Sequence, residues 1–230
     1  MSMIQWIDAL LNLLFPRSCV VCGGCLVKGE EAVCTMCNSR MPRTNYHLQP
    51  NNEIEQRFWG KAEIERATSY FFYNKGSDYR HILFKLKYNG YKELGEMMGR
   101  YMANELQTTD FLKGIDVIIP VPLHSKRKKA RGYNQSEWIA LGISHATGIP
   151  MDLNVLVRSV SNNTQTRKSV FDRWENVKDV FQVASPEKIQ GKHILLVDDV
   201  LTTGATLVSC ATKLLESSDV KITIITLAVA

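Results

Sequence analysis

Apolar residues recur along the chain with two different periods, which predict alternating strands and helices. Short runs rich in β-branched and aromatic residues, the pattern of buried strands, occupy residues 67–74, 114–122, 153–159, 191–199 and 220–230. Apolar residues at helical spacing lie between these runs, at 134–148, at 205–218 and at 78–107 with a break near Asn89–Gly90. Such alternation is typical of βαβ units, so we expect a parallel sheet covered by helices on both faces.

The first sixteen residues carry a further helical pattern, ended by Pro16. Its apolar positions are Ile4, Ile7, Leu10, Leu11 and Leu14. The segment lacks a basic start and a small-residue cleavage site, so we do not interpret it as a signal peptide. We expect an amphipathic helix that packs on the protein's own core or on a partner. Membrane-surface binding is disfavoured because the polar face carries no Lys or Arg.

Composition places the chain among globular proteins without membrane spans. Its 230 residues are 45% hydrophobic and 22% charged, and no apolar run approaches the roughly 20 residues of a transmembrane helix. The net charge of +5 mildly favours phosphate-bearing partners. The positive charge is concentrated in one run, Lys126, Arg127, Lys128, Lys129 and Arg131. Contact with nucleic acid and plain solvation remain open for its three lysines.

Five of the six cysteines crowd into residues 19–37, and without a secretion signal they indicate a metal site rather than disulfides. Two Cys-x-x-Cys pairs supply four thiolates for one tetrahedral, structural Zn²⁺: Cys19, Cys22, Cys34 and Cys37. Cys25 offers an alternative pairing with Cys22, and His47 is a weaker substitute ligand. We therefore predict a small metal-dependent unit over residues 1–45, a polar linker at 47–56, and one continuous domain over 57–230.

The run at 191–199 ends in two aspartates, Asp198 and Asp199, and a loop of small residues follows them into a helix. Ligands of open α/β sheets collect beyond the carboxyl ends of the strands. Backbone N–H groups at the helix start, with the hydroxyls of the loop, suit a phosphate, and Gly204 permits close backbone approach. The carboxylates would repel a phosphate directly, so a sugar diol between the two is the ligand that fits. The alternative is a plain strand–turn–helix connection in which Asp199 helps to cap the helix.

Residues 195–206, "LLVDDVLTTGAT", resemble the phosphoribosyl pyrophosphate (PRPP) binding signature of type I phosphoribosyltransferases. Further segments are similar to the ComF competence family: "LFPRSCVVCG" with Cys34-x-x-Cys37, "LKYNG" at 86–90, "VPLHSKRKKARGYNQSEWIA" at 121–140, and the Arg173, Asn176, Phe181 spacing. The acidic loop identifies the superfamily, and the RGYNQ segment with the cysteine unit specifies ComF. The resemblance implies a type I phosphoribosyltransferase-like parallel sheet flanked by helices, behind a small N-terminal zinc-ribbon-like unit.

The resemblance also implies roles for single residues. Asp198 and Asp199 would form the catalytic acidic pair and bind the ribose hydroxyls of PRPP with Mg²⁺. The 5-phosphate would lie in the cradle formed by Thr202, Thr203, Gly204, Ala205 and Thr206. Pyrophosphate would meet the loop Pro122, Leu123 and His124, the nearby Arg127 and Arg131, and a closing loop with Arg167, Lys168 and Arg173. No residue of the variable hood, expected within 57–110, indicates a nucleobase pocket.

For the whole chain the resemblance implies a cytoplasmic role in DNA uptake during natural transformation, with single-stranded DNA and a helicase-like competence protein as partners. Two other functions remain open. One is an active phosphoribosyltransferase that releases pyrophosphate from PRPP to a base or an amine. The other is a module that binds PRPP without turning it over.

Overall fold

The computed structural model describes residues 17–158 and 180–230. The helix expected over the first sixteen residues lies outside the described residues. So do three of the predicted pyrophosphate contacts, Arg167, Lys168 and Arg173.

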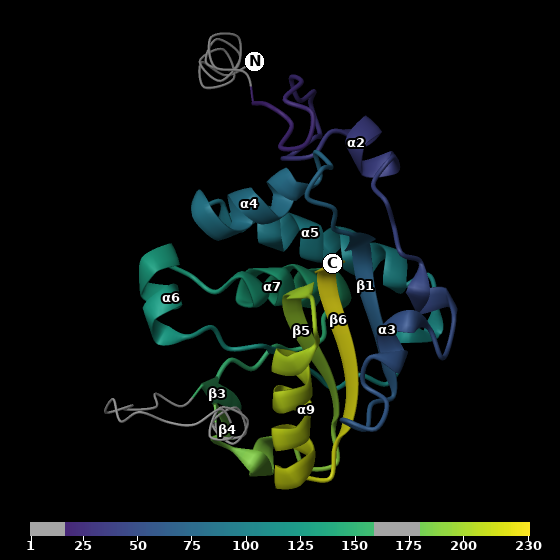
Figure 1. Cartoon of the computed structure of the whole chain (residues 1–230), viewed down its shortest axis with the longest axis vertical. Coiled ribbons are helices and arrows are strands. Elements are labelled where there is room, and N and C mark those ends of the chain that lie inside the picture. The colour runs from purple at the N-terminus through teal and green to yellow at the C-terminus, as the bar shows by residue number, and fades with distance from the viewer. Residues whose placement is uncertain (1–16, 159–179) are drawn as a thin grey trace.

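Four parallel strands form the main sheet, in the order β1-β6-β5-β2 (Figure 1). Their bounds are β1 (Arg66–Phe72), β2 (Val117–Pro120), β5 (His193–Leu201) and β6 (Lys221–Val229). The two inner strands are long and almost wholly buried, as the continuous apolar runs predict. The parallel sheet expected from the sequence is therefore confirmed.

Helices cover both faces of this sheet and enclose two separate buried clusters. One face carries α4 (Arg80–Tyr88), α5 (Lys92–Leu106) and α7 (Gln135–Thr147). The other face carries α3 (Glu53–Gln56), α9 (Ala205–Ser217) and a two-stranded antiparallel ribbon of β3 (Leu156–Arg158) and β4 (Phe181–Val183). The remaining elements are α2 (Thr35–Ser39), α6 (Ser125–Arg131) and the 3-10 turns η1 (Tyr46–Leu48), η2 (Asp110–Leu112) and η3 (Pro186–Lys188).

The strand predicted at 153–159 does not join the parallel sheet. Residues 150–152 take the edge position beside β2 instead, because Ile118 N–H donates to Pro150 O at 2.9 Å and Asp152 N–H donates to Ile118 O at 3.0 Å. The chain then turns away, with Asn154 N–H bonded to the Asp152 carboxylate at 2.7 Å. Residues 156–158 consequently pair with β4 in the separate ribbon.

The polar stretch at 47–56 is folded onto the sheet and is not a free linker. Asn52 is buried, and its amide donates to the carbonyls of Tyr46, Gln49 and Ala67 at 3.0–3.1 Å. Its side-chain oxygen accepts the first N–H groups of α3, and Ile54 is buried in the core. The polar residues here satisfy buried backbone groups, a role that composition alone does not reveal.

α5 and α7 pack closely because each contributes a glycine where they cross. A Cβ built on Gly142 would overlap the carbonyl oxygen of Glu96, and one on Gly99 would overlap that of Ile139. The two backbones therefore approach within the space that a single methyl group would fill. Among the described residues, no helix is long and apolar enough to span a bilayer.

This crossing predicts that Gly142→Ala destabilises the protein, although alanine is the better helix former. We expect urea denaturation to give a free energy of unfolding lowered by about 2–3 kcal/mol, because the added methyl forces the helix backbones apart. Gly76→Ala is the matched control, since a Cβ there meets only Asn74 Oδ1 at an ordinary 3.5 Å. A Gly142→Ala protein as stable as the control would contradict this packing.

Candidate functional site

The acidic pair lies within β5 and not at its last residue. The strand continues to Leu201, and Asp198 is still paired with Thr226 of β6. The expected strand end at Asp199 is therefore two residues too early. Pairing with β6 on one side and the end of β2 on the other holds both carboxylates at the carboxyl edge of the sheet.

Asp198 is half-buried, and its carboxylate is bound from the start of α7. Its Oδ1 accepts the Ser136 hydroxyl at 2.9 Å and the Asp199 N–H at 2.8 Å. Burial, and then the negative charge of Asp199, raise the pKa of Asp198 to about 7. The carboxyl is therefore only partly ionised at neutral pH, and a cation or a hydroxyl donor would favour its charged form.

Lys87 of α4 is the direct counterion of the pair. Its Nζ lies 3.1 Å from Asp199 Oδ2, and only 16% of the Asp199 side chain is exposed. Lys87 belongs to the "LKYNG" segment, to which the sequence assigned no role. The sequence could not identify this role, because the contact between Lys87 and Asp199 depends on how α4 packs over the sheet.

The threonine loop forms a small polar cavity directly after β5. The cavity measures about 40 Å³, and Asp198 lines it together with Thr202, Thr203, Gly204, Ala205 and Thr206. Gly204 adopts φ 79° at the N-cap of α9, and Ala205 and Thr206 of the first turn line this space, where helix N–H groups have no partner within the helix itself. On its outer side, Arg57 Nη1 donates to Thr202 O at 2.6 Å and anchors the loop.

The segment after β2 lies at the same sheet edge. Val121 N–H donates to Val197 O at 2.8 Å, which continues the β2–β5 pairing toward the acidic pair. Asn134 donates from Nδ2 to Val121 O at 2.9 Å and also caps α7. The predicted pyrophosphate loop, Pro122, Leu123 and His124, is half-buried between these points. His124 Nδ1 accepts from Lys126 N–H and so begins α6.

The basic run is a short helix, α6, with no buried residue. Arg131 donates to Gln135 Oε1 at 2.6 Å and stacks 5.6 Å from the Tyr88 ring, and Lys128 pairs with Glu137. Arg127 is exposed, and within the described chain no acidic partner is recorded for it.

Arg158 of β3 is a basic group that the sequence interpretation missed. Burial, and then the charge of Arg127, lower the pKa of the Arg158 guanidinium. Among the described residues its buried Nε has no hydrogen-bond partner, while its guanidinium lies over the Phe181 ring at 5.1 Å. Positive charge from both Arg127 and Arg158 favours an anion nearby.

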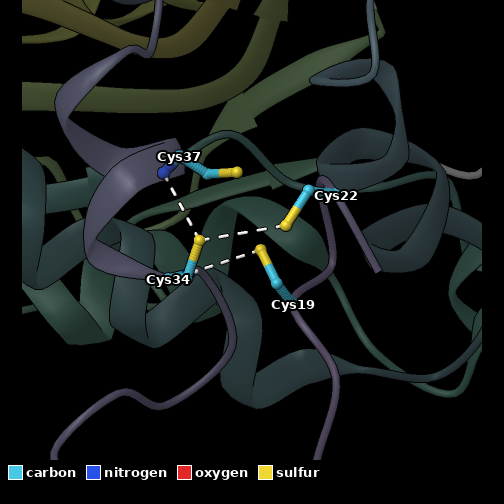
Figure 2. Close-up of side chains that lie close together, drawn as sticks. All are labelled: Cys19, Cys22, Cys34 and Cys37. Carbon is cyan, nitrogen blue, oxygen red and sulfur yellow. Dashed lines mark hydrogen bonds between the residues drawn. The ribbon is translucent and has the colours of Figure 1, made fainter. Parts of the chain in front are cut away.

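The four predicted zinc ligands come together on one side of α2 (Figure 2). The sulfur atoms of Cys19, Cys22, Cys34 and Cys37 all lie within 4.8 Å of one another, and Cys22 Sγ is 3.9 Å from Cys34 Sγ. A tetrahedral Zn²⁺ with sulfur at about 2.3 Å needs sulfur separations of about 3.8 Å. The donor set therefore fits a structural zinc, and neither Cys25, which is exposed, nor His47 belongs to the group.

Backbone groups already favour thiolates in this cluster. Burial alone would raise the pKa of Cys19, but N–H groups of Cys22, Cys34 and Val21 outweigh it and lower that pKa to about 7. Burial and the neighbouring thiols raise the pKa of Cys37 instead. A bound metal would deprotonate all four thiols and remove this conflict.

The cysteine unit shares its core with the sheet domain. Cys19 and Cys37 belong to the same buried cluster as Phe71 and Leu94. Tyr79 donates its hydroxyl to Cys37 O at 2.8 Å, and Glu31 forms an ion pair with Arg100 of α5. Loss of the metal would therefore disturb packing beyond the unit itself.

This arrangement predicts that Cys22→Ser loses the zinc while Cys25→Ser keeps it. Both cysteines are exposed and only three positions apart, so the pair separates ligation from general damage. We expect atomic emission to find zinc in the wild type and in Cys25→Ser only. The melting temperature of Cys22→Ser should fall by about 5–10 °C because the metal contributes folding free energy. Zinc retained by Cys22→Ser would contradict the assigned ligand set.

Comparisons with known proteins agree with both parts of the chain. The phosphoribosyl transferase domain model matches residues 92–230, more than half of the chain, and the double zinc ribbon domain model matches residues 10–48. The parallel sheet of the structure agrees with the phosphoribosyl transferase match, and the four-cysteine cluster agrees with the zinc ribbon match.

Similar proteins match along most of the chain. DNA utilization protein YhgH of Escherichia coli O157:H7 is 28% identical over 216 residues, covering 89% of this chain and 93% of the relative. Competence protein ComFC of Bacillus subtilis is 25% identical, with 83% and 81% covered. Competence protein F of Haemophilus influenzae is 38% identical over a shorter 109 residues, with 46% and 48% covered. The chain therefore belongs to the ComF family of proteins with a phosphoribosyl transferase domain, and it carries a double zinc ribbon ahead of that domain.

Proposed function

We propose that this protein binds PRPP with Mg²⁺ at the carboxyl edge of β5. The observation that carries the proposal is the junction of an acidic pair with a threonine-lined cavity at a helix N-terminus. A ribose 5-phosphate is the ligand that uses both features at once. Its diol donates to Asp198 and Asp199, and its phosphate accepts from the loop and from the start of α9.

The acidic pair also suits a divalent cation. Burial and the charge of Asp199 raise the pKa of Asp198, although the Ser136 hydroxyl and Lys87 act in the opposite direction, so an added cation would stabilise the charged pair. Asp198 and Asp199 would hold Mg²⁺ through the ribose hydroxyls or directly, together with oxygens of the ligand. When bound, the ion supplies positive charge that neutralises departing pyrophosphate.

The remaining contacts would serve the pyrophosphate. Pro122, Leu123 and His124 offer backbone groups beside the acidic pair, and Arg127 and Arg158 add positive charge from α6 and β3. Arg131 would contribute after leaving Gln135. Arg167, Lys168 and Arg173 stay predicted contacts of the closing loop. Catalysis at such a site consists of positioning and charge stabilisation, and the sequence carries no Ser-His-Asp or Cys-His signature for a protein nucleophile.

We further propose that the protein acts in the cytoplasm in DNA uptake, with single-stranded DNA and a helicase-like protein as partners. The proposal is supported by the names of the relatives, competence protein F and DNA utilization protein. It is also supported by α6, a basic helix without a buried residue in which Lys126 and Lys129 have no acidic partner among the described residues. The second candidate is an active transferase that passes the ribose 5-phosphate to an acceptor. The low exposure of Asp199, only 16% of whose side chain is accessible, favours it because a shielded site limits hydrolysis of the ligand.

PRPP binding is tested by calorimetric titration, with Mg²⁺, into the wild type and into Asp198→Asn/Asp199→Asn. We expect binding by the wild type and at least about a tenfold loss in the double variant, because charge-assisted bonds to the diol disappear. Glu216→Gln, at the far end of α9, removes an exposed carboxylate and should bind as the wild type does.

Failure of the wild type to bind PRPP would contradict the proposal. The acidic loop would then be inherited from an ancestral PRPP-binding protein without its function. Binding without pyrophosphate release, tested across base and amine acceptors, would support a sensing module and remove the transferase.

DNA binding is tested by fluorescence anisotropy of a labelled single-stranded oligonucleotide at low salt. We expect Lys126→Glu/Lys129→Glu to weaken binding at least about fivefold and to flatten its salt dependence, because phosphate contacts are lost. Lys113→Glu/Lys221→Glu makes the same charge change at the opposite edge of the sheet and should have little effect. If the wild type shows no binding, or if both variants weaken it equally, α6 is not the DNA contact.

A further inference from the structure

A second, larger cavity lies beside the acidic pair, under α4. It measures about 490 Å³, within the range of small-molecule sites, and its walls include Arg80, His81, Phe84, Lys87 and Tyr88. Val200 and Thr202 form its floor. Lys87 and Thr202 connect it to the PRPP site, since Lys87 binds Asp199 and Thr202 also lines the phosphate cavity. A molecule here would lie next to the ribose.

Two aromatic side chains give this cavity a stacking surface. Phe84 and Tyr88 are one helical turn apart on α4, with ring centroids 5.2 Å apart and ring planes at 44°. Although large and apolar, they are 53% and 68% exposed, so the protein's own core does not use them. Exposed aromatics beside a cavity favour a planar ligand that covers them.

The charges around the cavity are positive. Arg80 and Lys87 line it together with His81, and its described wall residues include no Asp or Glu. Arg80 Nη1 donates one hydrogen bond to Lys75 O at 2.9 Å, which orients the side chain. The other N–H groups of the guanidinium can bind a ligand. Lys87 is held at the inner end by Asp199. A planar guanidinium prefers a carboxylate, which it binds with two parallel hydrogen bonds.

We propose that this cavity is the acceptor site and that the acceptor is a planar aromatic carboxylate with a nucleophilic nitrogen. The inference rests on the proposed PRPP site. The ring would stack on Phe84 and Tyr88, and the carboxylate would pair with Arg80. The nitrogen attacks C1 of the ribose as the bond from C1 to the pyrophosphate oxygen breaks. Pyrophosphate leaves with the electron pair. An amine nitrogen then loses a proton to water, whereas a pyridine nitrogen, which has no proton to lose, keeps the positive charge.

The cavity lies within the stretch 57–110, where no single residue had indicated a base pocket. The sequence hides the site because its aromatic and basic positions follow ordinary helical spacing. α4 lies at the ends of β5 and β6 (Figure 1), and the cavity walls bring its residues together with Val200, Thr202 and Ala230.

The test titrates fluorescent 2-aminobenzoate into the full-length protein with PRPP and Mg²⁺, and 2-aminobenzamide as the matched uncharged probe. Pyridine-3-carboxylate competes as a further member of the class, and benzoate, which lacks the nitrogen, tests the contribution of the ring and carboxylate alone. We expect the acid to bind at least about tenfold more tightly than the amide. Arg80→Gln should remove that preference, whereas Phe84→Ala should weaken both probes. Trp59→Ala, an exposed aromatic outside the cavity, should change neither.

PRPP titration into the same variants separates the two proposals. Arg80→Gln and Phe84→Ala should bind PRPP as the wild type does, because neither residue contacts the acidic pair. Equal binding of acid and amide, or no binding of any acid by a protein that binds PRPP, overturns the acceptor proposal alone. A Phe84→Ala protein that binds the acids normally but loses single-stranded DNA binding also overturns the acceptor proposal. In that case the two aromatic rings would bind nucleic-acid bases. A wild type that binds the acids but not PRPP overturns the proposed function instead.

Discussion

The contact between the backbones of α5 and α7 is the constraint on which the ligand site depends. Gly99 and Gly142 remove the side chains that would keep the helices at ordinary distance. Close contact with α5 fixes the position of α7, whose first turn brings Ser136 to the carboxylate of Asp198. The capping residue Asn134 ties the same turn to the end of β2. A shift of α7 would disturb a hydrogen bond at the acidic pair before it exposed any core.

The electrostatics of the site follow from placing two carboxylates together at a half-buried strand end. Repulsion is reduced in three ways: by a lysine on Asp199, by a hydroxyl on Asp198, and by a pKa that leaves Asp198 partly protonated. The same lysine forms the boundary of the larger cavity under α4. Ligands on the two sides of Lys87 would therefore compete for, or share, one positive charge, which couples their binding.

The sequence was informative wherever function and local pattern coincide. Strand runs, helix periods, cysteine spacing and the acidic loop are all local, so the parallel sheet and the grouping of four thiols were predictable. Contacts set by packing were not: Lys87, Ser136 and Arg158 reach the site from α4, α7 and β3. Two segments were interpreted wrongly for the same reason. Residues 150–152, and not 153–159, pair with β2 at the edge of the sheet. The polar 47–56 stretch is fixed to the sheet by hydrogen bonds from the buried amide of Asn52.

The strand order has a consequence for how the protein is made. β6, the last strand along the chain, lies between β1 and β5, and β1 has no other partner in the sheet. During synthesis the first strand can pair only with residues 42–44 on its outer edge, and its inner edge must wait for residues about 150 positions later. Non-local pairing of this kind slows folding and exposes strands to aggregation. A chain that stalls before β6 would therefore not form a smaller version of the ligand site, because β5 would lack the neighbour that holds its carboxylates in place.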